Sequence, residues 1–283
     1  MPQGDLKFSD WPMFDRVMRD PDVCRRFLQV VLGIEVGRLD YVDVEKSLFP
    51  DIEAKSVRLD VFAKDSSHVF DVEMQSLPEK RLGRRLRYYQ AAMDVTSMPA
   101  GVAYDGLPES YIIFLCGHDP FGRGVPVYTF KMSCLEDSLT DLKCGFAWIV
   151  LNAEAWGCCE NPALKSLLKY TTEGSVEDDA LVKAIDGLVK EANQNREWRK
   201  NAMGVMTLEH HMKAHISMAR KEGLAEGHAE GLAEGFAEGK EQEDKRFSRL
   251  IDALFEADRV EDLRRVANDD AYRDKLFQEF GIA

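Results

Sequence analysis

The segment RLDVFAKDSSHVFDVEMQ, residues 58–75, contains two short apolar stretches that carry acidic residues and are separated by a polar turn. Asp60 lies in the first stretch and Glu73 in the second, and the β-branched and aromatic residues around them favour strands. Because side chains alternate between the two faces of a strand, Asp71, Glu73 and Gln75 share one face. The sequence therefore predicts a β-hairpin that places two carboxylates and an amide where a metal ion could bind.

Two interpretations of this hairpin are open from its residues alone. A divalent cation held by Asp60 and Glu73 would offset the cost of desolvating carboxylates on a strand. Alternatively, the hairpin is an ordinary amphipathic one with one face in water, which is the commoner arrangement in antiparallel sheets. Asp71 is predicted to be a solvated strand acid.

A resemblance to a known family favours the metal site. The segment FPDIEAKSVRLDVFAKDSSHVFDVEMQ, residues 49–75, resembles the core signature of the PD-(D/E)xK nuclease superfamily, and more narrowly that of the Rpn family of recombination-promoting nucleases and transposase-like proteins. The similar motifs are Leu59-Asp60-Val61, then Glu73-Met74-Gln75, then RLGRRLRYYQ at residues 81–90. The similarity covers roughly the first 150 residues. It implies a restriction-endonuclease-like α/β core of order αβββαβ, with a mixed central sheet flanked by helices and a helical C-terminal extension.

The resemblance also implies a mechanism. Asp60 and Glu73 would bind one or two Mg²⁺ ions, or Mn²⁺, and the metal would polarise the scissile phosphate and activate the attacking water. Gln75 would be the third catalytic residue, at the position where the superfamily has lysine. An amide can orient water or phosphate, but it supplies no positive charge. An acid on the first helix completes some sites of this kind, and Asp15 is the candidate here.

Four other residues have side chains that could belong to a metal site. Asp51 and Lys55 precede the hairpin, and because Asp51 follows Pro50 a turn is predicted there. His211 and His215 are four residues apart, a spacing that places both rings on one helix face. Because no third ligand is in view, an ordinary solvated helix is predicted for the two histidines.

A basic segment follows the hairpin, with five basic residues among the eight of KRLGRRLR, residues 80–87. A helix over 80–98 would separate two sets of side chains, with Arg81, Arg84, Arg85 and Tyr88 on one face and Leu82, Leu86 and Tyr89 on another. A basic face beside carboxylates suits a polyanion such as DNA, because phosphate contacts supply most non-specific affinity. A solvated basic face without a ligand is the alternative.

The composition is that of a folded protein with a local basic patch. The chain has 283 residues, of which 45% are hydrophobic, with a formal net charge of −13 and a pI of about 5.0. This is the wrong sign of charge for a protein that coats nucleic acid, although a nuclease needs only a local basic patch. The six cysteines have no CxxC spacing, and neither a secretory signal nor a stretch of membrane-spanning length is present. A reduced, cytoplasmic protein without a membrane partner is predicted.

The remaining pattern predicts the order of elements and the parts of the chain. Two helices divided at Pro21, strands over 37–45, 109–117 and 125–130, and a helical pattern from residue 141 onward are expected. The predicted parts are a nuclease-like domain over 1–158, a helical support region over 159–221, a Glu-Gly repeat over 222–245 and a small helical end module over 246–283.

The repeat EGLAEGHAEGLAEGFAEGKE, residues 222–241, has a period of four residues. That period is close to the 3.6 residues of a helical turn, but each glycine costs about 1 kcal/mol relative to alanine. The repeat is therefore either a marginal helix that promotes self-association or a flexible acidic spacer. For the whole chain we predict a homo-oligomeric, metal-dependent DNA endonuclease with a role in recombination, DNA mobility or phage defence. A catalytically silent nucleic-acid-binding protein and an oligomeric scaffold are the alternatives.

Overall fold

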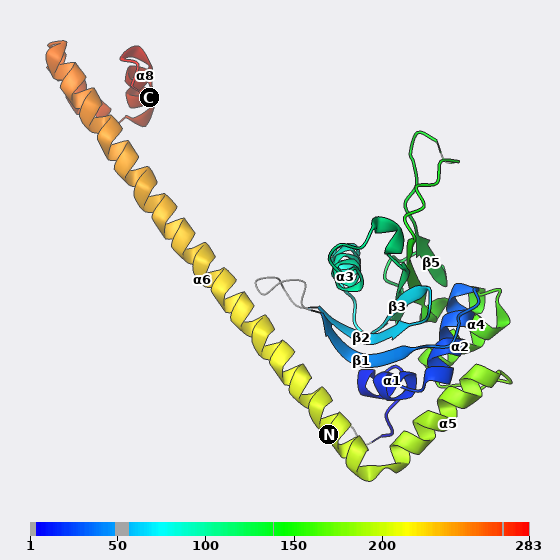
Figure 1. Ribbon diagram of the computed structural model, residues 1–283. Helices are drawn as coiled ribbons and strands as arrows, with labels where there is room; N and C mark the ends of the chain where they lie inside the picture. Colours follow the sequence, from blue (N-terminus) through cyan, green and yellow to red (C-terminus); the bar gives the residue numbers. More distant parts are fainter. Residues whose placement is uncertain (1–3, 49–56, 138, 268, 283) are drawn as a thin grey trace. The chain divides into compact units, whose positions relative to one another are not determined.

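The computed structural model describes residues 4–48, 57–137, 139–267 and 269–282 (Figure 1). Within these ranges, the side chains of residues 41, 209–230, 232–234, 236–237 and 264 are not described. The chain divides into two compact units, Met1–Thr207 and Leu208–Ala283. Across the described ranges, no helix combines the length and the apolar character needed to cross a membrane.

The first unit is built on one six-stranded mixed sheet with the strand order β1-β2-β3-β4-β6-β5. The strands are β1 (Tyr41–Leu48), β2 (Val57–Lys64), β3 (His68–Gln75), β4 (Glu109–Cys116), β5 (Val127–Phe130) and β6 (Phe146–Asn152). β1, β2 and β3 pair antiparallel, β3, β4 and β6 pair parallel, and β5 pairs antiparallel with β6 at the edge. The hairpin predicted over 58–75 is therefore confirmed as β2 and β3.

Helices cover both faces of this sheet (Figure 1). They are α1 (Trp11–Met18), α2 (Pro21–Leu32), α3 (Leu82–Ser97), α4 (Pro162–Glu173) and α5 (Ala180–Gln194), with short 3₁₀ turns η1 (Tyr104–Gly106) and η2 (Ala153–Cys158). α3 packs on the face formed by Leu59, Val69 and Phe114, and the other four α-helices pack on the face that includes Val61 and Val72. The predicted α/β class, with a mixed sheet flanked by helices, is confirmed.

The limits of the second helix follow from two residues at its junction with α1 and one at its end. Asp20 accepts hydrogen bonds from the backbone N–H groups of Asp22 and Val23, each at 3.0 Å, and so caps α2. Pro21 occupies the first helical position, where its missing N–H costs nothing. Gly33 ends α2 in the left-handed conformation, with φ of 67°. The predicted division at Pro21 is confirmed.

The helical pattern predicted from residue 141 onward is wrong at its start. Residues 146–152, FAWIVLN, form β6, which lies between β4 and β5 in the sheet. A short apolar run is compatible with a buried strand as well as with a helix. This one forms a strand because it pairs parallel with β4. The helical pattern begins only after β6, with η2 and α4. The strand predicted over 37–45 is displaced, because β1 spans Tyr41–Leu48.

The side chains of β2 change faces at Asp60. Val61 lies in the core on the α1 side, whereas Leu59 lies in the core on the α3 side, although residues two apart on a strand normally share a face. On β1, Glu45 lies between the partners of these two residues and has a left-handed φ of 57°. Such a φ is uncommon for a residue with a side chain. Asp60 therefore lies where the sheet is locally distorted.

The N-terminal segment is fixed to α5 by one side-chain amide. Asn193 Oδ1 accepts a hydrogen bond from the Leu6 N–H at 2.9 Å, and Asn193 Nδ2 donates to the Leu6 carbonyl oxygen at 2.9 Å. The amide thus pairs with both backbone groups of a buried residue that is 187 positions away in the chain.

Replacing Asn193 by Ala should lower the free energy of unfolding by about 1–3 kcal/mol, because both backbone groups of Leu6 lose their partner in a part-buried site. Chemical denaturation measures this change. The exposed neighbour Gln194 provides the control, and Gln194→Ala should change stability by less than about 0.5 kcal/mol. Equal losses in the two variants would contradict the assignment.

The second unit has a small core of its own. It contains the end of α6 (Arg196–Glu256), then α7 (Val260–Val266) and α8 (Asp270–Glu279). Its buried side chains are Leu250, Leu254, Val266, Leu276 and Phe277. The backbone of the repeat over 222–241 lies within α6, so of its two expected conformations the structure has the helix.

Candidate functional site

Asp60 and Glu73 face each other where the ladder between β2 and β3 ends. The ladder pairs Val61 with Val72 at this end. Beyond that pair, the Asp60 N–H donates to Glu73 Oε1 at 2.9 Å, and the Met74 N–H donates to Asp60 Oδ2 at 3.0 Å. Each carboxylate therefore accepts a hydrogen bond from the backbone of the opposite strand. The structure brings the two predicted acids together.

The acidic face of β3 is buried beneath α3. Glu73 is 1% exposed and Asp71 is 0% exposed, and neither oxygen of Asp71 has a hydrogen-bond partner. The prediction that Asp71 is a solvated strand acid is wrong. The alternative of a hairpin with one face in water is wrong for β3, whereas β2 does alternate buried residues with exposed or partly exposed ones. Both assume a purely antiparallel arrangement, whereas β3 pairs parallel with β4 in the sheet interior and is covered on both faces.

Arg85 of α3 reaches into this acidic group. Its guanidinium donates to a Glu73 carboxylate oxygen through Nη2 and to Gln75 Oε1 through Nη1, the latter at 2.9 Å. The guanidinium carbon also lies 4.9 Å from the ring centre of Tyr89 and 5.0 Å from that of Phe114. Contact with the two rings, which are tilted by 47° to each other, holds the guanidinium in place. Arg85 therefore supplies a fixed positive charge between Glu73 and Gln75.

Asp15 approaches the group from α1, on the opposite side of the sheet from α3. It is 6% exposed, and its Oδ1 has no hydrogen-bond partner. Burial, followed by the charges of Asp60 and Glu45, raises the pKa of Asp15 to about 8, against the opposing effect of Arg19. The structure thus places the predicted first-helix acid within electrostatic reach of Asp60.

The other buried acids also hold protons more tightly than usual. Burial and, after it, the Asp60 charge raise the pKa of Glu73 to about 8, while Arg85 opposes the shift. Burial raises the pKa of Asp71 well above its usual value, and the Glu73 and Asp60 charges add to this effect. The group contains more carboxyl groups than one arginine can neutralise, so added positive charge would be favourable here.

The donor set of this group suits a hard divalent cation. Mg²⁺ prefers carboxylate oxygens, and oxygens of Asp15 and Asp71 lack partners. Among the residues that the structure describes, no three His, Cys, Asp or Glu side chains are arranged closely enough to hold a metal ion. The Arg85 guanidinium already binds Glu73. A cation that bound Glu73 would have to take the place of that guanidinium.

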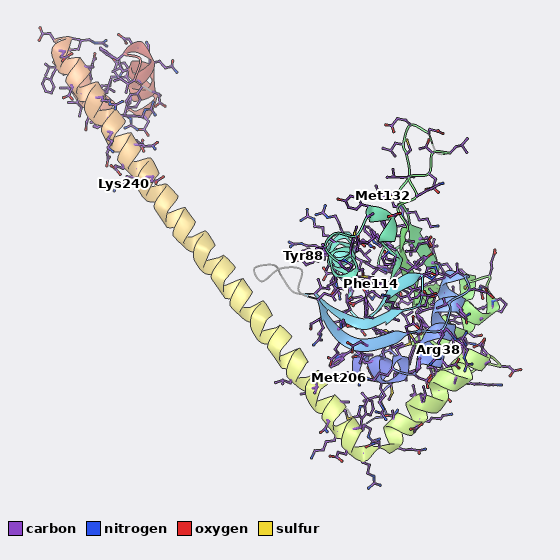
Figure 2. The ribbon with its side chains drawn as sticks, in the orientation of Figure 1. Arg38, Tyr88, Phe114, Met132, Met206 and Lys240 are labelled. Carbon is purple, nitrogen blue, oxygen red and sulfur yellow. The ribbon has the colours of Figure 1, made fainter. Side chains whose placement is uncertain are left out.

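The structure separates the predicted nucleic-acid-binding residues. Arg81, Arg84 and Tyr88 are exposed, whereas the Arg85 side chain is directed at the carboxylates. Figure 2 shows Tyr88 on α3 and Phe114 on the sheet beneath it. Arg81, Arg84 and Tyr88 therefore lie at the surface, and Arg85 belongs to the carboxylate site.

Four further candidates cannot be placed in the site. Asp51 and Lys55 lie outside the described residues. The backbone of His211 and His215 is part of α6, but their side chains lie outside the described part of the chain.

No protein-family model, curated protein or solved structure matches this chain. The site is therefore interpreted from its own geometry. Sequence reasoning missed Arg85 as the partner of Glu73, although a signal was present. Arg85 lies three residues after Leu82 and four before Tyr89, so it borders the stripe that faces the sheet.

Proposed function

We propose that this protein is a Mg²⁺-dependent DNA endonuclease with Asp60 and Glu73 at its centre. The observation that carries the proposal is the reciprocal bonding of these carboxylates to opposite strands at the end of a ladder. The resemblance of residues 49–75 to the PD-(D/E)xK superfamily and its Rpn family supports it. On the same ground we assign the α/β unit to the restriction-endonuclease-like fold.

The residues around the centre have separate roles in the proposed reaction. Asp60 and Glu73, with Asp15 as a further candidate, would hold Mg²⁺ or Mn²⁺. When bound, the ion would polarise the scissile phosphate and activate the attacking water. Gln75 orients water or phosphate through its amide. Arg85, which is hydrogen-bonded to Gln75, contributes the positive charge that an amide lacks. Arg85 and Gln75 together thus replace the superfamily lysine.

The proposed substrate contact uses the exposed residues of the basic segment. Arg81, Arg84 and Tyr88 contact the DNA backbone without reading its sequence. Because the net charge is −13, background affinity should be low and strongly dependent on salt concentration. The C-terminal helical region is the proposed place of homo-oligomer contacts.

The proposed function predicts cleavage of supercoiled plasmid that requires Mg²⁺. Asp60→Asn should lower the cleavage rate by about 100-fold or more, because a metal ion contributes several kcal/mol to stabilising the transition state. Asp43→Asn, on the part-exposed surface of the neighbouring strand β1, is the matched control and should cleave like the wild type. Gel electrophoresis of nicked and linear products measures the rate.

Absence of Mg²⁺- or Mn²⁺-dependent cleavage by the wild type, across plasmid, linear and single-stranded DNA, would refute the enzyme proposal.

The Arg85–Glu73 contact favours a second candidate function, that of a protein that binds nucleic acid without cutting it, because this contact competes with a metal ion for Glu73. Gel-shift binding that Arg84→Gln weakens, with no cleavage under any of these conditions, would favour that candidate.

A further inference from the structure

A cavity of about 370 Å³ lies between α1, β1 and the first turns of α6. Its volume is at the lower end of the roughly 300–1,000 Å³ typical of small-ligand sites. The side chains that decide its chemistry are two indoles, two guanidinium groups, two carboxyls and an amide, namely Trp11, Trp198, Arg16, Arg19, Asp15, Glu45 and Asn201. Such a lining suits a flat molecule that carries both a negative charge and hydrogen-bonding edges.

The flat surfaces in this cavity are those of Trp198 and Arg16. The guanidinium carbon of Arg16 lies 5.4 Å from the centre of the Trp198 ring. Nucleobases stack both on aromatic rings and on arginine planes, because each offers a flat polarisable face. The pair is therefore a stacking surface for a base.

The cavity also contains a buried polar group without a partner. Asp15 lines the cavity, is 6% exposed, and has no hydrogen-bond partner for its Oδ1. A buried oxygen of this kind is normally paired, and a rotation of the Asp15 side chain would bring it to a donor on a ligand in the cavity. The amide of Asn201 can both donate and accept at the edge of a base.

The charge of the cavity favours an anionic ligand. Arg16 and Arg19 both line it, and both side chains are exposed to solvent. The acidic residue on the β1 side, Glu45, has its own partner in Arg58 at 3.5 Å. A guanidinium matches a phosphate group in both charge and geometry, so Arg19 provides a phosphate contact next to the stacking surface.

We infer that this cavity takes one nucleotide of the nucleic-acid substrate, with its base stacked at Trp198 and Arg16 and its phosphate at Arg19. The inference rests on the proposed function, and it adds a substrate class to it. Asp15 belongs to the cavity and lies within electrostatic reach of Asp60, so the bound nucleotide lies on the α1 side of the sheet, the side from which Asp15 approaches the carboxylate centre. A base inside a duplex cannot enter a cavity, so the preferred strand is locally unpaired.

Isothermal titration of the full-length protein with deoxyadenosine 5′-monophosphate tests this inference, in EDTA so that no metal contributes. The nucleotide should bind about 10-fold or more tightly than deoxyribose 5-phosphate, because only the nucleotide has a base to stack. Trp198→Leu should remove that difference. Trp156→Leu, at a tryptophan outside this cavity, should keep it.

A second variant guards against loss of folding in Trp198→Leu. Val205 lines the cavity and is 48% exposed, so Val205→Glu should fold and weaken nucleotide binding by charge repulsion. Leu208→Glu adds the same charge at a position 62% exposed outside the cavity and should bind like the wild type.

The outcomes separate this inference from the proposed function. Nucleotide binding that Trp198→Leu and Val205→Glu both weaken supports the cavity, whatever the plasmid assay shows. Equal affinity for the nucleotide and for deoxyribose 5-phosphate would show a simple anion site and overturn the inference. Unchanged nucleotide binding in Val205→Glu would overturn it too, even if Mg²⁺-dependent cleavage is intact.

Discussion

Arg85→Gln should lower the free energy of unfolding by about 3–5 kcal/mol at pH 9, because it removes the cation that faces the buried Glu73 carboxylate. At pH 6 the loss should be smaller. The pKa of Glu73 is about 8, so below that pH the carboxyl group can take up a proton instead of remaining as an unpaired charge. Thermal or urea unfolding in EDTA at the two pH values measures both effects.

Arg84→Gln is the matched control, because Arg84 has the same charge, is on the same helix and is exposed. It should change the free energy of unfolding by less than about 0.5 kcal/mol at either pH. Mg²⁺ should restore part of the stability lost in Arg85→Gln, since a bound cation stabilises the folded state by mass action. A loss that Arg84→Gln reproduces, or that is independent of pH, would show that Arg85 does not neutralise Glu73.

Asp71→Asn should stabilise the protein increasingly as pH rises. Asp71 keeps its proton in the folded state because its pKa is raised, whereas the unfolded chain loses that proton above pH 3.8. The unfolded state therefore binds fewer protons than the folded state. Between pH 3.8 and the raised pKa, the free energy of unfolding of the wild type falls by up to about 1.4 kcal/mol per pH unit. Asparagine does not titrate, so the free energy of unfolding of the variant should rise relative to that of the wild type as pH increases from 3.8 towards the raised pKa.

Asp65→Asn is the opposite case in the same hairpin. Asp65 accepts hydrogen bonds from the N–H groups of Ser67 and His68 at 2.8 Å and 2.7 Å, and its pKa is lowered. Its stabilising effect is present above pH 3.8 and is lost as pH falls through the lowered pKa. Asp65→Asn should therefore destabilise the protein near neutral pH and much less in acid. The same sign of pH dependence in both variants would contradict the assigned environments.

The parts of the fold that follow local periodicity are predictable from the sequence. The alternation in residues 58–75 predicts β2 and β3, and Pro21 predicts the division between α1 and α2. β6 is not predictable in this way, because FAWIVLN is a continuous apolar run without alternation. Its identity depends on β4 lying alongside it, and the paired residues of the two strands are 36 positions apart in the chain.

The candidate site is predictable in part for the same reason. Asp60 and Glu73 can be paired from the sequence because a hairpin sets which residues face each other. The burial of Asp71 cannot, since it depends on the parallel pairing with β4 and on α3 covering that face. The contact of Arg85 with Glu73 depends on where α3 crosses the sheet, and helical periodicity alone gives only the neighbours within that helix.

The reciprocal bonds of Asp60 and Glu73 couple ligand binding to the backbone. Asp60 Oδ2 accepts a hydrogen bond from the Met74 N–H, and Glu73 Oε1 accepts one from the Asp60 N–H. These two bonds close the end of the β2–β3 pair. Each of these oxygens keeps a second lone pair, but a ligand that displaces either N–H competes with strand closure, and its observed affinity is then reduced by the free energy of opening that end. The coupling is reciprocal, so a substitution that loosens the end of the pair would strengthen such a ligand by the same factor. Affinity at this centre is therefore adjustable from backbone positions that never touch the ligand.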